Sequence, residues 1–247
     1  MSAERLAELI RQEGPAVVLT GAGISVPSGI PDFRTPATGL WANVDPMEVA
    51  HISVWRREPE RFWSFYGRRF AILDGKQPNG AHRAVAELER RGLVSGVITQ
   101  NIDGLHAEAG TEDPIEVHGS IRTSSCLTCG MRYSLAETRA RGEVPRCACG
   151  AVLKPDVVLF GEMLPERAML RATALAATAG LMIAIGSSLE VWPVGGLPED
   201  TLTTGGKLAL VTMGPTPYDD VAAVKLSGDV VEEMEAVVAA LDGYSAA

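Results

Sequence analysis

The chain is short of cysteine and of basic residues, and each shortage excludes a class of protein. Its 247 residues include four Cys, too few for a disulfide scaffold in a chain of this length. With 22 Lys and Arg against 31 Asp and Glu, the net charge is −9 and the pI is near 5.0. Because binding to phosphate backbones needs clustered Lys and Arg, we expect no direct nucleic-acid binding as the main function.

Apolar runs of membrane-spanning length are also scarce. The N-terminal segment carries charges at Glu4, Arg5, Glu8 and Arg11, so it has no apolar signal core. Residues 172–189 are uncharged, but Gly180 interrupts them, and we interpret them as a helix end, a turn and a buried strand. A hydrophobic share of 46% supplies a large core and excludes bulk disorder. We therefore expect a soluble, cytoplasmic protein, a monomer or weak oligomer, with no membrane partner.

Short apolar runs alternate with segments that have helical spacing. Strand-like runs are found at residues 16–20, 94–99, 115–118, 157–160, 181–185 and 207–212, and helical patterns at 2–13, 80–92 and 229–242. This alternation predicts an α/β fold with a parallel sheet covered on both faces.

Two stretches break the alternation and are interpreted as insertions into one α/β domain. Residues 36–80 have a helical pattern and hold three of the four Trp, whereas residues 122–152 hold every Cys and many turn formers. The predicted large domain therefore consists of residues 1–35, 81–121 and 153–247. The helical and cysteine-containing modules together form the predicted small domain.

The cysteines predict a zinc site. Cys126 and Cys129 form a C-x2-C pair, and Cys147 and Cys149 form a C-x-C pair after a gap of the length found in zinc sites. Two thiolates on each tight turn can fill the corners of a tetrahedron, which leaves no open position, so the zinc would be structural. Free cysteines or a redox pair are the alternative, and the C-x-C spacing departs from the usual pattern.

The glycine-rich segment 21–25 follows the first predicted strand, where a phosphate-binding turn belongs. The third Gly of the dehydrogenase fingerprint is missing, since position 26 is Val, and no acidic residue ends a second strand about 20 residues on. A dinucleotide site therefore fits, whereas a hydride-transfer enzyme is not supported. A tight strand–helix turn without a ligand is the alternative.

Polar residues follow three other predicted strands, at 99–103, 118–120 and 186–188. Ligands of open α/β sheets bind at the carboxyl ends of the strands, so these segments and residues 21–25 form one candidate site. His118 can act as a base near neutral pH, although a lone His is more often structural, as we expect for His51, His82 and His106. No G-x-S-x-G segment surrounds any candidate Ser, so a hydrolase is unsupported.

In combination these motifs resemble the sirtuins, NAD-dependent protein-lysine deacylases. The matching segments are GAGISVPSGIPDFR (21–34), TQNIDGLHAEAG (99–110), EVHGS (116–120), the four Cys, KPDVVLFGEMLP (154–165) and GSSLEVWP (186–193). The resemblance implies a Rossmann-like domain with a small domain made of a helical and a zinc module, and NAD and one structural zinc ion as cofactors.

The resemblance also implies a mechanism and a set of contacts. The acyl oxygen of the substrate would attack C1′ of the nicotinamide ribose and expel nicotinamide, after which His118 would act as general base on the ribose hydroxyls. Asn101 and Asp103 would complete the catalytic set through contacts to the ribose and the carboxamide. Further NAD contacts would come from Gly21, Ala22, Gly23, Ile24, Ser25, Asp32, Phe33, Arg34, Gln100, Ile102, Gly186, Ser187, Ser188, Thr212, Met213 and Asp229.

Acyl-lysine proteins or peptides would be the substrates, adding as a strand against residues 158–163 and 189–193. The contacts would come from Val157, Val158, Phe160, Gly161 and Glu162. Tyr66 and Arg69 resemble the Tyr-x-x-Arg motif of desuccinylase-type sirtuins, in which Arg pairs with the carboxylate of a succinyl or malonyl group. The alternative is an aromatic helix packing face with solvated arginines.

The chain departs from the family pattern at Thr35-Pro36, where Gly is usual, and at Thr212, where Asn is frequent. The first departure stiffens the cofactor loop, and the second puts an adenosine-ribose contact in doubt. Two other functions fit the same fold: a mono-ADP-ribosyltransferase and a non-catalytic module that binds NAD or ADP-ribose. The presence of His118, Asn101 and Asp103 counts against the non-catalytic module.

Overall fold

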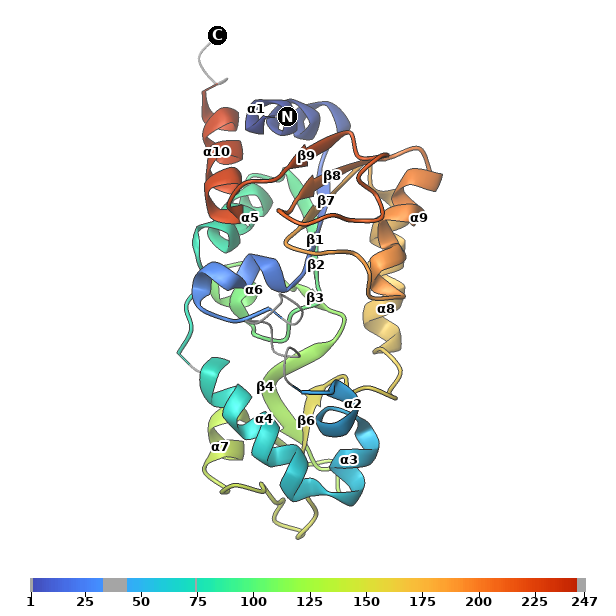
Figure 1. Ribbon diagram of the computed structural model, residues 1–247. Helices are drawn as coiled ribbons and strands as arrows, with labels where there is room; N and C mark the ends of the chain where they lie inside the picture. Colours follow the sequence, from blue (N-terminus) through green and yellow to red (C-terminus); the bar gives the residue numbers. More distant parts are fainter. Residues whose placement is uncertain (1, 33–43, 74, 244–247) are drawn as a thin grey trace.

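The computed structural model describes residues 2–32, 44–73 and 75–243, and its larger part is built on a six-stranded parallel sheet (Figure 1). The strand order is β3-β2-β1-β7-β8-β9. The strands are β1 (Ala16–Thr20), β2 (Val94–Thr99), β3 (Ile115–Glu116), β7 (Leu181–Ile185), β8 (Lys207–Val211) and β9 (Val224–Leu226). This is the Rossmann order, in which the direction of winding reverses between β1 and β7 and leaves a crevice for a ligand.

Helices cover both faces of this sheet. One face packs against α1 (Ala3–Glu13), α5 (Gly80–Arg90) and α10 (Val230–Asp242), and the other against α8 (Glu166–Thr178) and α9 (Leu197–Thr203). Side chains of β1 and β7 alternate between the two cores: Val18 and Ile183 face the first, Val17 and Met182 the second. Strands buried on both faces explain why these runs are apolar throughout.

A smaller unit has its own core. It contains α2 (Pro46–Val49), α3 (Ile52–Arg57), α4 (Pro59–Leu73), α7 (Leu135–Arg139) and an antiparallel sheet of β5 (Arg132–Ser134), β4 (Gly119–Ser125) and β6 (Lys154–Val157). Its core joins the aromatic residues of α4, such as Phe62 and Phe70, to Leu153, Val157 and Leu159. The small unit is thus assembled from two stretches far apart in sequence.

The chain passes from one sheet to the other at Val117 and His118, between β3 and β4. It returns at β6, where Val157 is paired with Gly119. Three short helices complete the described structure: the 3-10 helices η1 (Ala22–Ser28) and η2 (Val194–Gly196), and α6 (Leu105–Glu108). His118 therefore lies on the connection between the two units.

The predicted α/β fold with a small unit built from both insertions is confirmed, and residues 172–189 are a helix end, a turn and strand β7. The prediction of a strand at 157–160 is wrong in place, since β6 ends at Val157. The segment is apolar because Val157 and Leu159 are buried in the core of the small unit, not because it forms a strand. Phe160 makes an isolated β-bridge with His51. No helix in the described ranges is long and apolar enough to cross a membrane.

Candidate functional site

The turns after β1 and β7 touch each other through backbone. Gly23 N–H donates to the Gly186 carbonyl (2.8 Å), and Gly21 N–H donates to the Ile185 carbonyl (3.0 Å). A Cβ on Gly23 would lie 2.8 Å from the Gly186 Cα, and one on Gly186 only 2.2 Å from the Ile24 nitrogen. Neither position tolerates a side chain, so the glycines bring bare backbone to the point where the sheet reverses its winding.

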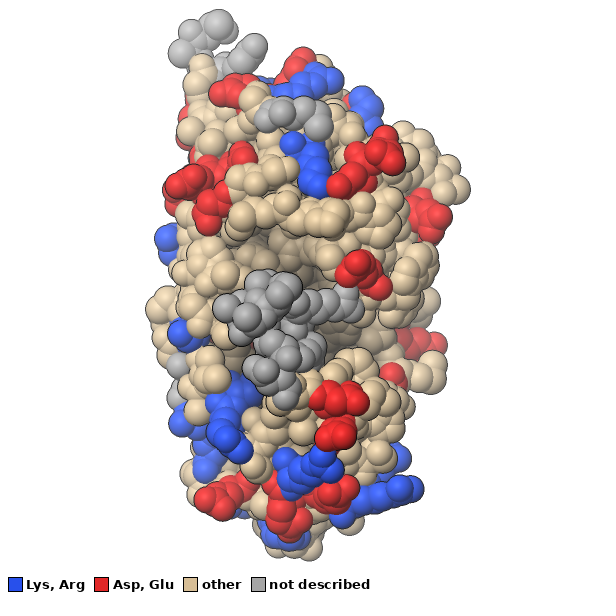
Figure 2. Space-filling view, in the orientation of Figure 1, with Lys and Arg blue, Asp and Glu red and all other residues tan. Residues whose placement is uncertain are grey.

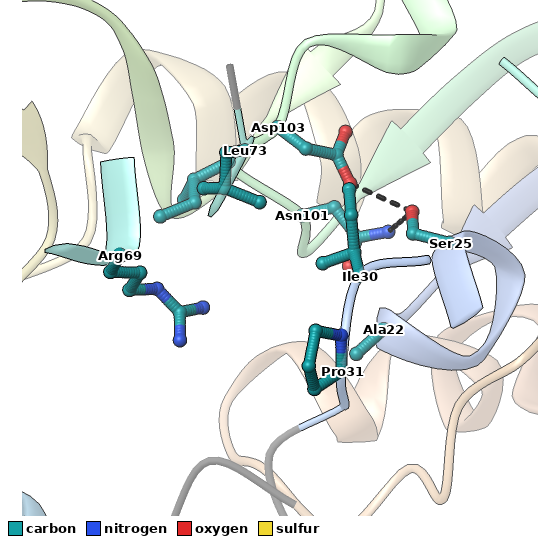
Figure 3. A pocket seen from close by; sticks show the side chains of 9 residues that line it. Ala22, Ser25, Ile30, Pro31, Arg69, Leu73, Asn101 and Asp103 are labelled. Atoms are coloured by element: carbon teal, nitrogen blue, oxygen red, sulfur yellow. Dashed lines mark hydrogen bonds between the residues drawn. The ribbon is translucent and has the colours of Figure 1, made fainter. Parts of the chain in front are cut away.

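Ser25 joins two polar residues from the end of β2. Its hydroxyl donates to Asp103 Oδ2 (2.7 Å) and accepts a hydrogen bond from Asn101 Nδ2 (3.1 Å). Asn101 Nδ2 also donates to the Gly21 carbonyl (3.0 Å), and Asp103 Oδ1 accepts the Leu105 N–H (2.9 Å). The glycine-rich turn and the β2 end are therefore held in one geometry through side chains that line a small pocket (Figure 3).

Two buried histidines support this arrangement from behind. His106 Nε2 lies 3.0 Å from Thr20 Oγ1, and the Thr20 hydroxyl donates to Thr99 Oγ1 (2.8 Å). Because the Thr20 proton is used in that bond, His106 Nε2 must carry a hydrogen and donate it. Burial lowers the pKa of His106 to about 3, so the ring is neutral at pH 7.

His82 contacts the site through Ser25, with Nε2 3.4 Å from the serine oxygen. Its Nδ1 accepts the Asn79 N–H (3.4 Å), which assigns the proton to Nε2. Burial lowers the pKa of His82 to about 4, and its ring packs edge-on against that of His106 with centroids 5.0 Å apart. Both rings are thus neutral hydrogen-bond donors.

His118 is half-buried between the two sheets. Its Nδ1 lies 2.9 Å from the Gln100 carbonyl, which can only accept, so Nδ1 is protonated and Nε2 keeps its lone pair. Burial lowers the pKa of His118, although the bond to Gln100 opposes the shift. Gln100 in turn donates to Ser187 Oγ (3.0 Å) after β7, which links all three strand ends.

Arg69 enters the same pocket from the small unit. The lining residues are Ala22, Ser25, Ile30, Pro31, Arg69, Leu73, Asn101, Ile102 and Asp103, and the Arg69 side chain extends from α4 toward the pocket (Figure 3). Burial lowers the pKa of Arg69, whereas Tyr66 and Asp103 oppose the shift by electrostatic attraction. Burial also raises the pKa of Tyr66 to about 12, so its phenol is neutral. The Tyr66 ring itself packs in the small core, stacked on Phe62 at 4.5 Å.

The four cysteines form one cluster. Their Sγ atoms all lie within 4.8 Å of one another, with Cys126 to Cys149 at 3.5 Å and Cys129 to Cys147 at 3.4 Å. Zn–S bonds of about 2.3 Å in a tetrahedron place sulfurs about 3.8 Å apart, so the cluster fits one zinc ion with four protein ligands. The Tyr133 hydroxyl also lies 3.2 Å from Cys147 Sγ, so the cluster has a polar neighbour outside the four cysteines. Gly130 and Gly150 have φ of 77° and 90° and close the two turns.

Comparison with known proteins identifies the family. The model of the Sir2 family matches residues 21–193. NAD-dependent protein deacetylases of Sulfolobus acidocaldarius and Thermotoga maritima are 46% and 42% identical, over 89% and 94% of this chain and 87% and 95% of theirs. The chain belongs to the Sir2 family.

Solved Sir2 structures superpose closely on this chain. A complex with a deacetylated p53 peptide and 3′-O-acetyl ADP-ribose has a TM-score of 0.92 at 40% identity, covering 97% of this chain and 98% of that one. A complex with a p53 peptide and NAD⁺ has a TM-score of 0.89 at 39% identity, with coverage of 97% and 98%. NAD as the cofactor therefore agrees with the names of the relatives. A structural zinc ion agrees with the cysteine cluster.

Most site residues predicted from the Sir2 motifs lie around the reversal point of the sheet. Gly21 to Ser25, Gln100 to Asp103, His118 and Gly186 to Ser188 are brought together there. Thr212 and Met213 follow β8, and Met213 is exposed. Asp229 caps α10 by accepting the Val231 N–H (2.8 Å). Phe33, Arg34 and the departure at Thr35-Pro36 lie outside the described residues.

The prediction from sequence did not include part of the polar network of this Sir2 protein. Thr20 was predicted only as a strand residue, and His82 and His106 only as structural histidines. They are structural, and they also contact Ser25 and the hydroxyls behind Asn101. The signal that could have found them is polarity at buried positions: Thr20, His82 and His106 are polar residues that are 0–2% exposed, and Thr20 ends an otherwise apolar strand.

Proposed function

We propose that this Sir2 protein is an NAD-dependent protein-lysine deacylase that removes acetyl groups and also takes acidic acyl groups such as succinyl and malonyl. The observation that carries the proposal is the meeting of His118, Asn101 and Asp103 with the glycine-rich turns after β1 and β7 at one crevice. Relatives of this chain with the same overall length are named NAD-dependent protein deacetylases.

Glycine at positions 21, 23 and 186 lets the turns after β1 and β7 pack directly on each other, and in the proposal the pyrophosphate of NAD lies across this pair of turns. In the proposal, the hydroxyls of Ser187 and Ser188 and the side chain of Gln100 complete the surface that faces the pyrophosphate. Asn101 and Asp103 face the nicotinamide end, since both line the pocket. Bound NAD would supply the ribose carbon that the acyl oxygen attacks, with nicotinamide as the leaving group.

His118 is the proposed general base. Its tautomer leaves Nε2 as the only ring atom that can take a proton, and the lowered pKa keeps that atom unprotonated at pH 7. Because the Gln100 carbonyl fixes the ring through Nδ1, the base needs no reorientation before it removes the proton of a ribose hydroxyl. A positioned base of this kind contributes about 10²–10⁴-fold to rate.

The acyl-lysine is proposed to reach this centre past residues 157–161. Val158 N–H donates to the His118 carbonyl (2.8 Å), so this segment runs directly beside the proposed base. Val157 is buried, whereas Phe160 is 46% exposed. An apolar floor next to the base suits an acyl chain, and an extended edge beside it suits a peptide that adds as a strand.

The preference for acidic acyl groups rests on Arg69. Arg69 is 9% exposed and lines the pocket, and a guanidinium there can pair bidentately with a carboxylate in a region of low dielectric. The neutral Tyr66 phenol can donate a hydrogen bond to the same group. Packing of Tyr66 on Phe62 holds the ring in place, so packing and acyl binding are compatible in one side chain.

One assay tests the proposal and its alternatives. The purified protein is incubated with NAD and with matched acetyl- and succinyl-lysine peptides, and acyl-ADP-ribose and nicotinamide are quantified by mass spectrometry. We expect both peptides to be turned over. Arg69→Met should lower kcat/KM for the succinyl peptide by about tenfold or more, through loss of a charged hydrogen bond, and should leave the acetyl peptide within a few-fold. Tyr66→Phe should show a smaller effect of the same kind.

Three outcomes contradict parts of the proposal. ADP-ribose attached to protein without deacylation would instead identify a mono-ADP-ribosyltransferase. NAD binding with no loss of any acyl group would identify a binding module. Equal losses on both peptides in Arg69→Met would refute the acidic-acyl assignment alone.

A further inference from the structure

A buried lysine lies beneath the segment proposed to bind substrate. Lys154, at the start of β6, has a side chain that is 11% exposed. Its ammonium donates to the carbonyls of Pro155 (3.2 Å) and Val157 (2.9 Å) and pairs with Glu162 Oε2 (2.9 Å). All three protons of the ammonium are therefore used, each on a different part of one loop.

The two carbonyls belong to the outer edge of β6. Residues two apart in a strand direct their carbonyls to the same edge, so Pro155 and Val157 share one edge. Within the described residues, β6 pairs with β4 and with no other strand. A Cβ on Gly119 of β4 would lie 2.1 Å from the oxygen of Asp156, which faces that partner. The Lys154 ammonium thus covers the unpaired edge up to Val157.

Glu162 fixes the C-terminal end of the segment that follows β6. Its Oε2 accepts the Leu159 N–H (2.9 Å) as well as the lysine, and its own N–H donates to the Leu159 carbonyl (3.0 Å). Gly161 inside this turn has φ of 82°, which favours glycine. The side chain and the backbone of one residue therefore close the turn that ends the segment.

An ion pair that is mostly withdrawn from solvent, with Lys154 11% and Glu162 26% exposed, adds little stability by itself, because well-packed apolar residues of similar size often stabilise as well or better. Directional bonds to three named oxygens give orientation instead. The loop they orient, 157–161, contains the residues proposed to contact the acyl-lysine, and its Val158 N–H is bonded to His118.

We propose that Lys154 and Glu162 are positioning residues for the acylated peptide. By occupying the β6 edge as far as Val157 and closing the turn at Glu162, they fix the shape of residues 158–161, beside which the peptide would add. Backbone bonds of Phe160 with Ala50 and Ile52 hold the same segment from the small unit. A loop held in advance in its binding shape lowers the cost of ordering on association. This inference rests on the proposed deacylase function, since it concerns the binding of that substrate.

The test compares Lys154→Met with Lys154→Arg and with a matched control. Lys207→Met is the control, because Lys207 makes a similar ion pair with Glu13 at 2.6 Å on the opposite side of the larger unit. We expect Lys154→Met to raise the KM for acetyl peptide by about tenfold while kcat and the KM for NAD change by less than about threefold. Lys154→Arg, which keeps charge and donors, should recover most of the loss, and Lys207→Met should resemble the unsubstituted protein.

If turnover is too slow to measure, a direct measurement of peptide binding tests the same inference. Fluorescence anisotropy of a labelled acetyl-lysine peptide gives its Kd without NAD, and zinc content with a melting curve reports on folding. If Lys154→Met does not fold, Glu162→Gln replaces it, since the amide keeps an acceptor for Leu159 and loses the charge. An unchanged peptide KM and Kd in a folded variant would overturn the inference. A failure of the unsubstituted protein to deacylate any peptide would instead overturn the proposed function.

Discussion

At Ser25 one hydroxyl receives hydrogen bonds from two side chains and gives its own to a third. The donors are Asn101 and His82, and the acceptor is Asp103. A hydroxyl has one proton and two lone pairs, so this arrangement uses its full capacity. Every residue of the network therefore fixes the direction of its neighbours, which is what a site that relies on positioning requires.

His118 predicts the pH dependence of turnover. Burial lowers its pKa below the ordinary histidine value of about 6.5. The base is therefore active above its lowered pKa, and kcat/KM should be constant through neutral pH and fall as the pH drops through a value below 6.5. A pH profile of kcat/KM from 4.5 to 8 measures this. An acid limb with its midpoint above 6.5 would contradict the assignment.

Sequence alone pointed to His118, Asn101 and Asp103 as candidates because each follows a recognisable strand, and the structure brings these candidates to one edge of the sheet. It could not find the contacts of His106 or His82, because hydrogen bonds to Thr20 and Ser25 join residues 86 and 57 positions apart. Similarly, in the sequence Lys154 is a single charged residue before an apolar run. Its role became visible only when the structure showed which carbonyls its ammonium contacts.

At the scale of elements, β1, β2 and β7 have the predicted bounds, because a run buried on both faces contains few residues other than apolar ones. Strands β4 and β5 of the small sheet were not predicted, and β6 was predicted in the wrong place. Residues 119–125 are GSIRTSS, which has only Ile121 to mark a core face. In that unit the structure depends on the cysteine cluster and on a core shared with α4, neither of which is local in sequence.

The zinc cluster gives a prediction for these elements. Cys149→Ser should reduce bound zinc from about one per chain to near zero, because the remaining three thiolates no longer close the tetrahedron. Loss of the metal should loosen β4, β5 and β6 and abolish deacylation. Zinc quantification and hydrogen exchange of the small sheet measure both effects.

The matched control is Thr128→Ala, an exposed residue inside the first turn that supplies no ligand. It should retain zinc and activity. Full zinc occupancy in Cys149→Ser would show that this residue is not a ligand.

At the scale of the whole molecule, the buried histidines link stability to pH. His106 has a folded-state pKa of about 3 against about 6.5 when unfolded, so the unfolded chain binds more protons between these values. Its contribution is complete above pH 6.5 and is lost as the pH falls toward 3. Between pH 7.5 and 5.5 this one residue should lower the free energy of unfolding by about 1.4 kcal/mol.

Urea denaturation at pH 7.5 and 5.5 tests the prediction, with zinc content checked at each pH. His106→Gln keeps a donor for Thr20 but does not titrate, so its loss of stability between the two pH values should be smaller by about 1.4 kcal/mol. An equal loss of unfolding free energy in both proteins would show that groups other than His106 cause the pH dependence of stability.

Charged side chains of both signs are spread over the visible face. Figure 2 shows Lys and Arg on the left and lower parts of the small unit with Asp and Glu among them, and both kinds on the larger unit as well. The surface is hollowed between the two units, where the strand ends of the parallel sheet meet the small sheet. A chain of net charge −9 therefore holds an anionic dinucleotide by local geometry rather than by its overall field.

The pairing of Gly119 with Val157 has a consequence for how such a molecule can change over evolutionary time. The cysteine-bearing segment leaves and re-enters the larger unit at two adjacent positions, so its ends are already closed by strand pairing. Lengthening a loop whose ends are held together costs little, because loop-closure entropy grows only with the logarithm of length. Insertions between the two cysteine pairs can accordingly accumulate, and new recognition surfaces can be grafted there, while the geometry around His118 is inherited unchanged.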